Sequence, residues 1–417
     1  MSTPRPLPLW AGRTLALSGI LLVALNLRTA VAAVSPITDQ IAVDIPLTSV
    51  ALGALGALPP IAFAASGLLA PIVARKVGLE RGIALAAAAM VLGSAIRGFS
   101  DSYLVLLVGS VLALAGMGFG NILLPPAVKR YFPDRIGLVT TAYATLLAVS
   151  TAVPAVLSAP LADAAGWRVS LGIWAILALT SLLPWLLLLL QNRRARAAAA
   201  ASGEVVVDVE IDAAEPALFR RMLRSRVAWA IGLSFAVSSL NAYALFAWLP
   251  AMLGDIAGVD RVTGGALLAV YGIAGLPAAI VVPLIAVRIK NVGLLVELGV
   301  AFFVAGYLGL LFAPTFAPLL WVILAGLGPL IFPVCLVLIN LRTRSHHTST
   351  ALSGVVQTIG YSVGALGPLL VGVLHNSTDS WTAPLLFLLA TTAIAAVTGV
   401  MLARARYVED DLAELPA

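Results

Sequence analysis

The chain has 417 residues, of which 61% are hydrophobic and 11% charged, with a formal net charge of +6. Its mean hydropathy of +1.05 excludes the soluble classes of protein and indicates a chain that lies within a membrane. The positive charge does not indicate nucleic acid, because the basic residues follow a membrane topology. The single cysteine excludes an intrachain disulfide.

Twelve apolar stretches follow one another along the chain, each close to the roughly 20 residues that a membrane-spanning helix needs. They predict an all-α membrane protein with twelve transmembrane helices. The stretches cover approximately residues 14–34, 49–74, 82–98, 103–126, 136–160, 168–190, 227–252, 262–287, 292–312, 317–340, 350–374 and 382–403. No small-residue cleavage site ends the first stretch, so we expect it to be retained and not removed as a signal peptide.

Arg28 is the only charged residue of the first span, LALSGILLVALNLRTAVAAV. A fixed charge in hydrocarbon costs at least about 2.5 kcal/mol unless it faces a cavity or a partner. We therefore expect Arg28 to face a cavity and to bind an anionic or strongly polar solute. The alternative is that its long side chain reaches the outer lipid headgroups. On a helix, the Asn26 side chain points nearly opposite to that of Arg28, so both cannot face the cavity. We expect Asn26 to bond a neighbouring helix. If Arg28 pairs with lipid phosphate instead, Asn26 is the residue that we expect to face the cavity.

The basic residues divide unequally between the two sides of the predicted membrane. With the N-terminus in the cytosol, 21 of the 25 lysines and arginines fall on the inner side. This asymmetry is the positive-inside pattern of plasma (bacterial inner) membrane proteins. The even number of spans then places both termini in the cytosol.

The longest break between spans, about residues 192–226, separates six spans from six. We expect an N-terminal bundle over 12–191, a cytosolic linker over 192–221 and a C-terminal bundle over 222–405. Near the end of the break, apolar residues fall on one helical side and arginines on the other. This pattern predicts a helix on anionic lipid, the alternative being a solvated linker. Its apolar residues are Leu218, Phe219, Met222 and Leu223.

Matches at one offset, 210 to 214 residues, indicate that the six-helix unit is duplicated. The pairs are Pro71 with Pro283, Gly116 with Gly326, and Trp167 with Trp381. A unit with an even number of spans keeps its orientation, so the two repeats are expected to be parallel, related by an axis along the membrane normal.

This organisation resembles the major facilitator superfamily over essentially the whole chain. The local motifs are similar to the cyanate and 2-nitroimidazole permease (CynX/NimT-type) family. They are Asn26-Leu-Arg28, Gly116-Met-Gly-Phe-Gly-Asn121-Ile-Leu-Leu-Pro125, Phe132-Pro133 and Trp248-Leu-Pro250. The resemblance implies the twelve-helix facilitator fold and a permease for cyanate-like anions or nitroimidazole-like compounds. Fold resemblance alone does not identify the solute.

Several uncharged polar or aromatic residues inside spans are further candidates for solute binding. Each alone has the alternative of an interhelical contact worth about 1 kcal/mol. Together they would suit a small, flat, polar solute. They are Asn121 and Tyr143 in spans four and five, Asn241, Tyr243 and Trp248 in span seven, and Gln357 and Tyr361 in span eleven.

Acidic groups are scarce within the spans. Glu297 lies near the inner end of span nine, and we expect it to pair with Lys290 or Arg288 at the interface instead of carrying protons. This scarcity argues against a drug/proton antiporter, and three non-central histidines argue against a membrane enzyme, a metal site or a cofactor. If the solute enters with a proton, the anion itself would neutralise Arg28.

The sequence therefore predicts a monomeric secondary transporter that moves a small polar or anionic solute by alternating access, with membrane lipid as its surroundings. A multidrug exporter of the same superfamily is the alternative within transport. A channel is the alternative from another class, but a duplicated six-helix unit suits two rocking halves better.

Overall fold

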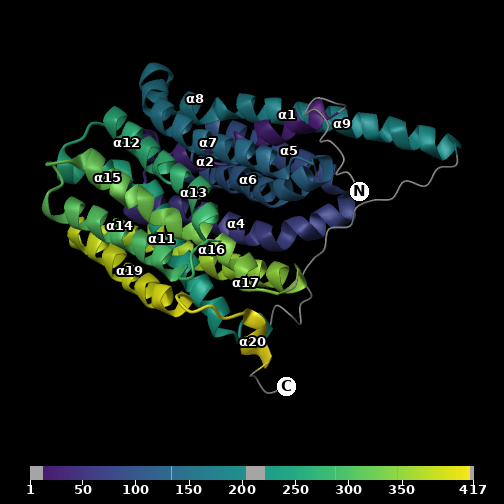
Figure 1. Ribbon diagram of the computed structural model, residues 1–417. Coiled ribbons are helices and arrows are strands. Elements are labelled where there is room, and N and C mark those ends of the chain that lie inside the picture. Colours follow the sequence, from purple (N-terminus) through teal and green to yellow (C-terminus); the bar gives the residue numbers. More distant parts are fainter. Residues whose placement is uncertain (1–12, 133, 203–220, 287, 345, 414–417) are drawn as a thin grey trace.

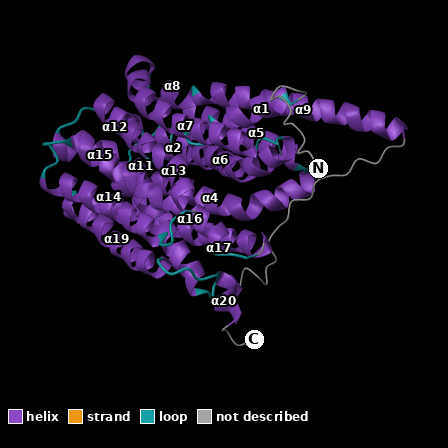
Figure 2. Ribbon diagram, in the orientation of Figure 1, coloured by secondary structure: helices purple, strands orange, loops and turns teal. Residues whose placement is uncertain are grey.

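The computed structural model describes residues 13–132, 134–202, 221–286, 288–344 and 346–413. Within them the chain consists of helices and loops, with no strand (Figure 1, Figure 2). Twelve helical segments are long and apolar enough to cross a membrane, which confirms the predicted number of spans.

The first half of the chain forms spans one to six. Span one is α1 (Thr14–Ala24) with α2 (Thr29–Ala32), and η1 (Ser35–Ile37) and α3 (Thr38–Asp44) follow it. Spans two to five are α4 (Ser49–Val77), α5 (Leu79–Gly98), α6 (Tyr103–Tyr131) and α7 (Ile136–Ala165). Span six is α8 (Trp167–Gly172) with α9 (Trp174–Ser202).

The second half forms spans seven to twelve. Spans seven to nine are α11 (Arg226–Ala257), α12 (Arg261–Ala274) with α13 (Leu276–Ala286), and α14 (Gly293–Phe312). Spans ten to twelve are α15 (Pro318–Leu327), η2 (Gly328–Leu330) and α16 (Ile331–Leu341), then α17 (His346–Gly364) with α18 (Leu366–Thr378), then α19 (Thr382–Leu402). A short helix, α20 (Val408–Ala413), closes the described chain.

The helices run roughly parallel, so the bundle has two ends (Figure 1). We name the end where α1 begins and α19 ends the terminal end, and the opposite end the distal end. The terminal end lies on the right in Figure 1, where α9 projects from the bundle and α20 lies below α17.

The region between the halves departs from its predicted bounds. Helix α9 continues to Ser202, past the expected end of the first bundle at 191. Residues 203–220, including Leu218 and Phe219 of the predicted lipid-bound helix, lie outside the described residues. Met222 of that helix is fully buried in the core of the second half, so this side chain does not face lipid.

Span one is broken, whereas the sequence predicts one continuous helix over 14–34. The amides of Asn26 and Leu27 bond carbonyls three residues back, at 2.9 and 3.2 Å, in place of the four-residue bonds of an α-helix. Arg28 follows with φ −131° and ψ −1°, outside the helical region, before α2 begins. The break therefore places Arg28 at an irregular point within the span.

One contact repeats at the distal end of both halves. In the first half the Trp167 indole donates to Asp44 Oδ2 at 2.9 Å, joining the start of span six to α3 after span one. In the second half Trp381 donates to Asp255 Oδ2 at 2.7 Å, joining span twelve to span seven. We call these contacts the Asp–Trp clips; their residues are offset by 211 and 214 positions.

A second contact repeats at mid-height. Asn26 Nδ2 donates to its own helix at Leu22 and to the Leu177 carbonyl of span six. Asn241 Nδ2 donates to its own helix and to Thr391 Oγ1 of span twelve. The two asparagines are 215 positions apart. The halves thus share side-chain contacts as well as helix order, in agreement with two parallel six-helix repeats.

The halves meet closely at the distal end. Ser35 Oγ donates to the Ala247 carbonyl at 2.8 Å, joining η1 to α11. Gly56 of α4 lies so near Ala247 and Pro368 that a Cβ atom would contact both within 3 Å. The absence of a side chain at Gly56 therefore lets the two halves close over the centre of the bundle.

Candidate functional site

A central cavity of about 230 Å³ lies between the two halves at mid-height. Its wall combines spans one and five of the first half with spans seven, eight, ten and eleven of the second. A cavity bounded by both repeats changes shape when one repeat moves against the other.

Helix breaks form much of this wall. Arg28 stands where span one is broken, Gly275 separates α12 from α13, and Pro329 lies in η2 between α15 and α16. Interrupted helices are tolerated at membrane depth where the irregular backbone lines a cavity. The breaks thus bring backbone and side chains of several spans to one place.

Arg28 is the cationic group of the central cavity. Its guanidinium lies over the Phe63 ring, with Cζ 4.9 Å from the ring centroid. Its Nη1 atom is buried without a hydrogen-bond partner. Among the described residues, no carboxylate pairs with it. The cavity therefore presents an uncompensated positive charge.

Three aromatic rings surround this charge. Phe63 comes from span two, Tyr243 from span seven and Tyr361 from span eleven, with ring centroids 6.0 to 6.4 Å apart and steep interplanar angles. We call them the aromatic triangle. Tyr243 and Tyr361 also line the cavity, as Arg28 does, so aromatic side chains and the cation share one wall.

The structure brings together three of the predicted site residues, Arg28, Tyr243 and Tyr361, in this wall. It adds residues that the sequence did not single out. Phe63 supports Arg28, and Thr151, Ser238 and Ser239 contribute small polar groups to the wall. Ser238 and Ser239 could have been identified from the sequence, because two adjacent serines are unusual in an apolar span. Phe63 could not, because nothing in the sequence distinguishes it from other apolar residues of span two.

Three other candidates bond neighbouring helices. Asn26 donates to the Leu177 carbonyl of span six. This contact agrees with the expectation that Asn26 bonds a neighbouring helix when Arg28 faces the cavity. Asn241 is fully buried, bonded to Thr391 and accepting from Tyr307 at 2.7 Å. Trp248 donates to the Pro368 carbonyl at 2.9 Å at the distal end. These contacts are the interhelical alternative considered for such residues.

The remaining candidates lie beside the cavity. Tyr143 and Gln357 each precede a wall residue, Leu147 and Tyr361, by four positions and so lie one helical turn toward the terminal end. Gln357 donates to Ser353 at 2.8 Å. Asn121 is half-buried on α6, away from the wall.

The ion pair predicted for Glu297 is wrong for the described part of the chain. Its Oε1 atom is buried without a hydrogen-bond partner against Gly399 of span twelve, where a Cβ atom would collide with it. The carboxyl packs between spans nine and twelve, and no ion pair joins it to Lys290 or Arg288 among the described residues. In the same described residues no group of three or more metal-ligating side chains occurs.

Comparison with known proteins places these features in context. Residues 16–368 match the Major Facilitator Superfamily. The chain is 30% identical to the 2-nitroimidazole transporter of Escherichia coli (strain K12) over 399 residues, covering 94% of this chain and 96% of that protein. It is 30% identical to the uncharacterized transporter YycB of Bacillus subtilis (strain 168), covering 94% of each. It is 25% identical to the E. coli cyanate transport protein CynX, covering 87% and 90%.

Solved structures share the fold at low identity. A bacterial homologue of the human lysosomal transporter Spinster, in an inward-facing and unoccupied conformation, has a TM-score of 0.76 at 14% identity, covering 95% of this chain and 99% of that one. The D-xylose-proton symporter has a TM-score of 0.69 at 13% identity, covering 95% and 98%. With the twelve spans, these matches confirm the predicted fold class.

Proposed function

The chain belongs to the major facilitator superfamily, in its cyanate and 2-nitroimidazole permease family, and is a secondary transporter of a small solute; we propose that Arg28 binds this solute in the central cavity. The proposed solute is a small, flat anion or nitro compound, of the kind that its relatives' names indicate. The single supporting observation is the Arg28 guanidinium, which lines the cavity and pairs with no carboxylate of the described residues.

The chemistry of the wall suits such a solute. A guanidinium presents a planar fork of donors that matches two coplanar acceptor oxygens, as in a nitro or carboxylate group. The rings of Tyr243 and Tyr361 offer faces against which a flat solute can stack. An anion that enters with a proton would neutralise Arg28 without a carboxylate relay.

We also propose the orientation of the protein. The positive-inside asymmetry supports a cytosolic terminal end, in a monomer embedded in the plasma (bacterial inner) membrane. The distal end, where Ser35 bonds Ala247, then faces outward. Closure at that end supports an inward-facing arrangement.

The test is a pair of substitutions at Arg28. Arg28→Ala should reduce uptake of 2-nitroimidazole or cyanate at least tenfold while the protein remains folded, because the change removes the charge that binds the solute. Arg28→Lys should restore little, because an ammonium lacks the planar fork. Uptake into cells and binding to purified protein are the measurements.

Arg288→Ala, which removes an exposed arginine at the terminal end, is the matched control and should behave as wild type. Near-wild-type binding and uptake by Arg28→Ala would overturn the proposal. Arg28-independent efflux of chemically diverse drugs would instead favour the multidrug-exporter alternative.

A further inference from the structure

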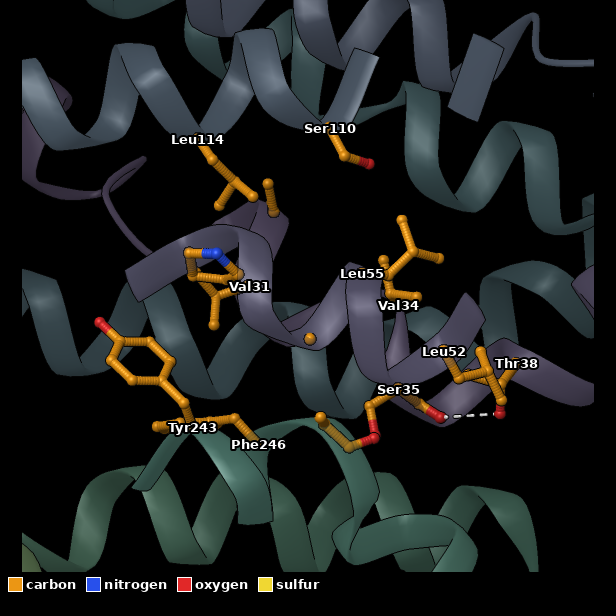
Figure 3. Close-up of a pocket in the computed structure, with 14 residues that line it drawn as sticks. Val31, Val34, Ser35, Thr38, Leu52, Leu55, Ser110, Leu114, Tyr243 and Phe246 are labelled. Carbon is orange, nitrogen blue, oxygen red and sulfur yellow. Dashed lines mark hydrogen bonds between the residues drawn. The ribbon is translucent and has the colours of Figure 1, made fainter. Parts of the chain in front are cut away.

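A second, smaller pocket of about 40 Å³ lies beside the central cavity (Figure 3). We call it the distal pocket. Val31, Tyr243 and Phe246 line both spaces, so these three side chains form a partition between them. Figure 3 shows Ser110 and Leu114 on one wall of the distal pocket and Tyr243 with Phe246 on the opposite one.

The distal pocket lies between the partition and the closed end of the bundle. Its wall comes from spans one, two and four of the first half and from span seven of the second. Ser35 and Ala247, whose hydrogen bond joins the halves at the distal end, also line it. A solute that leaves the central cavity toward the distal end must therefore pass the partition and enter this pocket.

One polar group in the distal pocket is unsatisfied. Ser110 is 4% exposed, and its hydroxyl has no hydrogen-bond partner in the part of the chain that the structure describes. The hydroxyls of Thr38 and Ser35 are engaged, Thr38 with the Ser35 carbonyl at 3.3 Å and Ser35 with the Ala247 carbonyl. Buried hydroxyls normally find a partner. The Ser110 hydroxyl, on the wall that faces Leu55 and Val34 in Figure 3, is thus free to bond a guest.

We propose that the distal pocket is a second binding position for the transported solute, anchored by the Ser110 hydroxyl. Since one water-sized sphere needs roughly 10–15 Å³ of such volume, the space accepts an acceptor-bearing group of about three heavy atoms. A cyanate-like anion fits whole, whereas a nitroazole fits by its nitro end. This inference rests on the proposed function and extends it to the route between the central cavity and the distal side.

The experiment separates binding from passage. Ser110→Leu fills the distal pocket, and Ser110→Ala removes only its hydroxyl. Ser181→Ala is the matched control, since Ser181 is a buried serine bonded within its own helix. With 2-nitroimidazole and sodium cyanate as probes, all three purified proteins should bind within twofold of wild type. Uptake should fall at least tenfold for Ser110→Leu, about threefold for Ser110→Ala, and not for Ser181→Ala.

Wild-type uptake by Ser110→Leu would overturn the inference, because a filled pocket would not then obstruct the route. Equal losses of binding and uptake would also overturn it, because the pocket would then not be separate from the cavity. Failure of the proposed function has a different signature: Arg28→Ala would bind the probes as wild type does, while the uptake defect of Ser110→Leu persisted.

Cysteine labelling at position 110 tests the same inference without depending on the folding of Ser110→Leu or Ser110→Ala. Cys335 is buried, and Cys335→Ser leaves no other cysteine in the chain. In that background, Ser110→Cys should react with a small impermeant methanethiosulfonate added from the distal side, and 2-nitroimidazole or sodium cyanate should slow the reaction at least threefold. No protection by either probe would contradict a solute position at Ser110.

Discussion

The charge of Arg28 at membrane depth has a free-energy cost that the contact with Phe63 offsets only in part. Insertion of such a charge costs at least about 2.5 kcal/mol. The cation–π contact with Phe63 returns roughly 0.5–2 kcal/mol. Under the proposed function, a bound anion or nitro group would offset the remaining cost, so that the occupied protein would be favoured over the empty one.

Asp44 offers a test at the scale of one carboxyl group. Hydrogen bonds from Trp167 and Arg168 lower the pKa of Asp44 below its ordinary value. Such a group stabilises the fold at pH values above its unfolded pKa, about 3.9, and the contribution is lost as the pH falls through the lower, folded pKa. Asp44→Asn should therefore lower the melting temperature at pH 7, and its difference from wild type should shrink below about pH 4.

Thermal unfolding of detergent-purified protein at several pH values measures this difference. Asp39→Asn, which alters an exposed carboxylate of the same helix, is the control and should show no pH-dependent difference from wild type. If the melting temperature of Asp44→Asn stays below that of wild type by the same amount down to pH 3, the charge of Asp44 does not stabilise the Asp–Trp clip.

The sequence identified Arg28 because a lone charge in an apolar span stands out. It did not separate Tyr243 and Tyr361, which reach the cavity, from Asn241 and Trp248, which bond neighbouring helices. Both kinds of residue are polar groups in apolar helices. The difference depends on where each helix is broken and how it is rotated, which one chain's residue pattern does not contain.

Two of the three helix breaks in the wall of the central cavity carry residues that interrupt helices, and the third does not. Span eight breaks at Gly275, just before Pro277, and span ten at Gly328-Pro329, so both carry residues that interrupt helices. Span one breaks at Leu25–Arg28 without a glycine or proline. Hydropathy thus locates spans well, whereas a break imposed by tertiary packing leaves no local signal.

Gly275 gives the prediction for the elements. A Cβ atom there would lie 3.7 Å from the Gly326 carbonyl, an ordinary contact, and φ is −76°. Gly275→Ala should leave stability unchanged or raise it by up to about 1 kcal/mol, because alanine favours helix. Uptake should fall severalfold if the break between α12 and α13 serves movement. Melting temperature and initial uptake rate are the two measurements.

The matched variant is Gly306→Ala in span nine. There a Cβ atom would lie 2.7 Å from the Ala325 backbone amide, so spans nine and ten must separate. This variant should lose roughly 1–3 kcal/mol of stability through overpacking. If Gly275→Ala instead loses stability and keeps full uptake, the break is a packing feature without a role in transport.

At the scale of the whole molecule, the orientation of the bundle is the remaining prediction. Reporter fusions after Ala417 and within 200–212 should both report a cytosolic location, because the predicted topology places 21 of the 25 basic residues on that side. A fusion within the short connection between α5 and α6, at about residue 101, is the control for the opposite side. A periplasmic signal at either of the first two sites would reverse the topology and the assignment of an inward-facing arrangement.

The paired asparagines show which positions of the two halves correspond near the central cavity. Asn26 and Asn241 lie 215 residues apart, and each bonds the sixth span of its own half. The same offset makes Arg28 the counterpart of Tyr243, and both face the central cavity. The two halves thus place a cation and a phenol at matching positions of the same framework. A substitution at either position alters the lining of the cavity and leaves intact the asparagine bonds that join spans one and seven to the sixth span of each half.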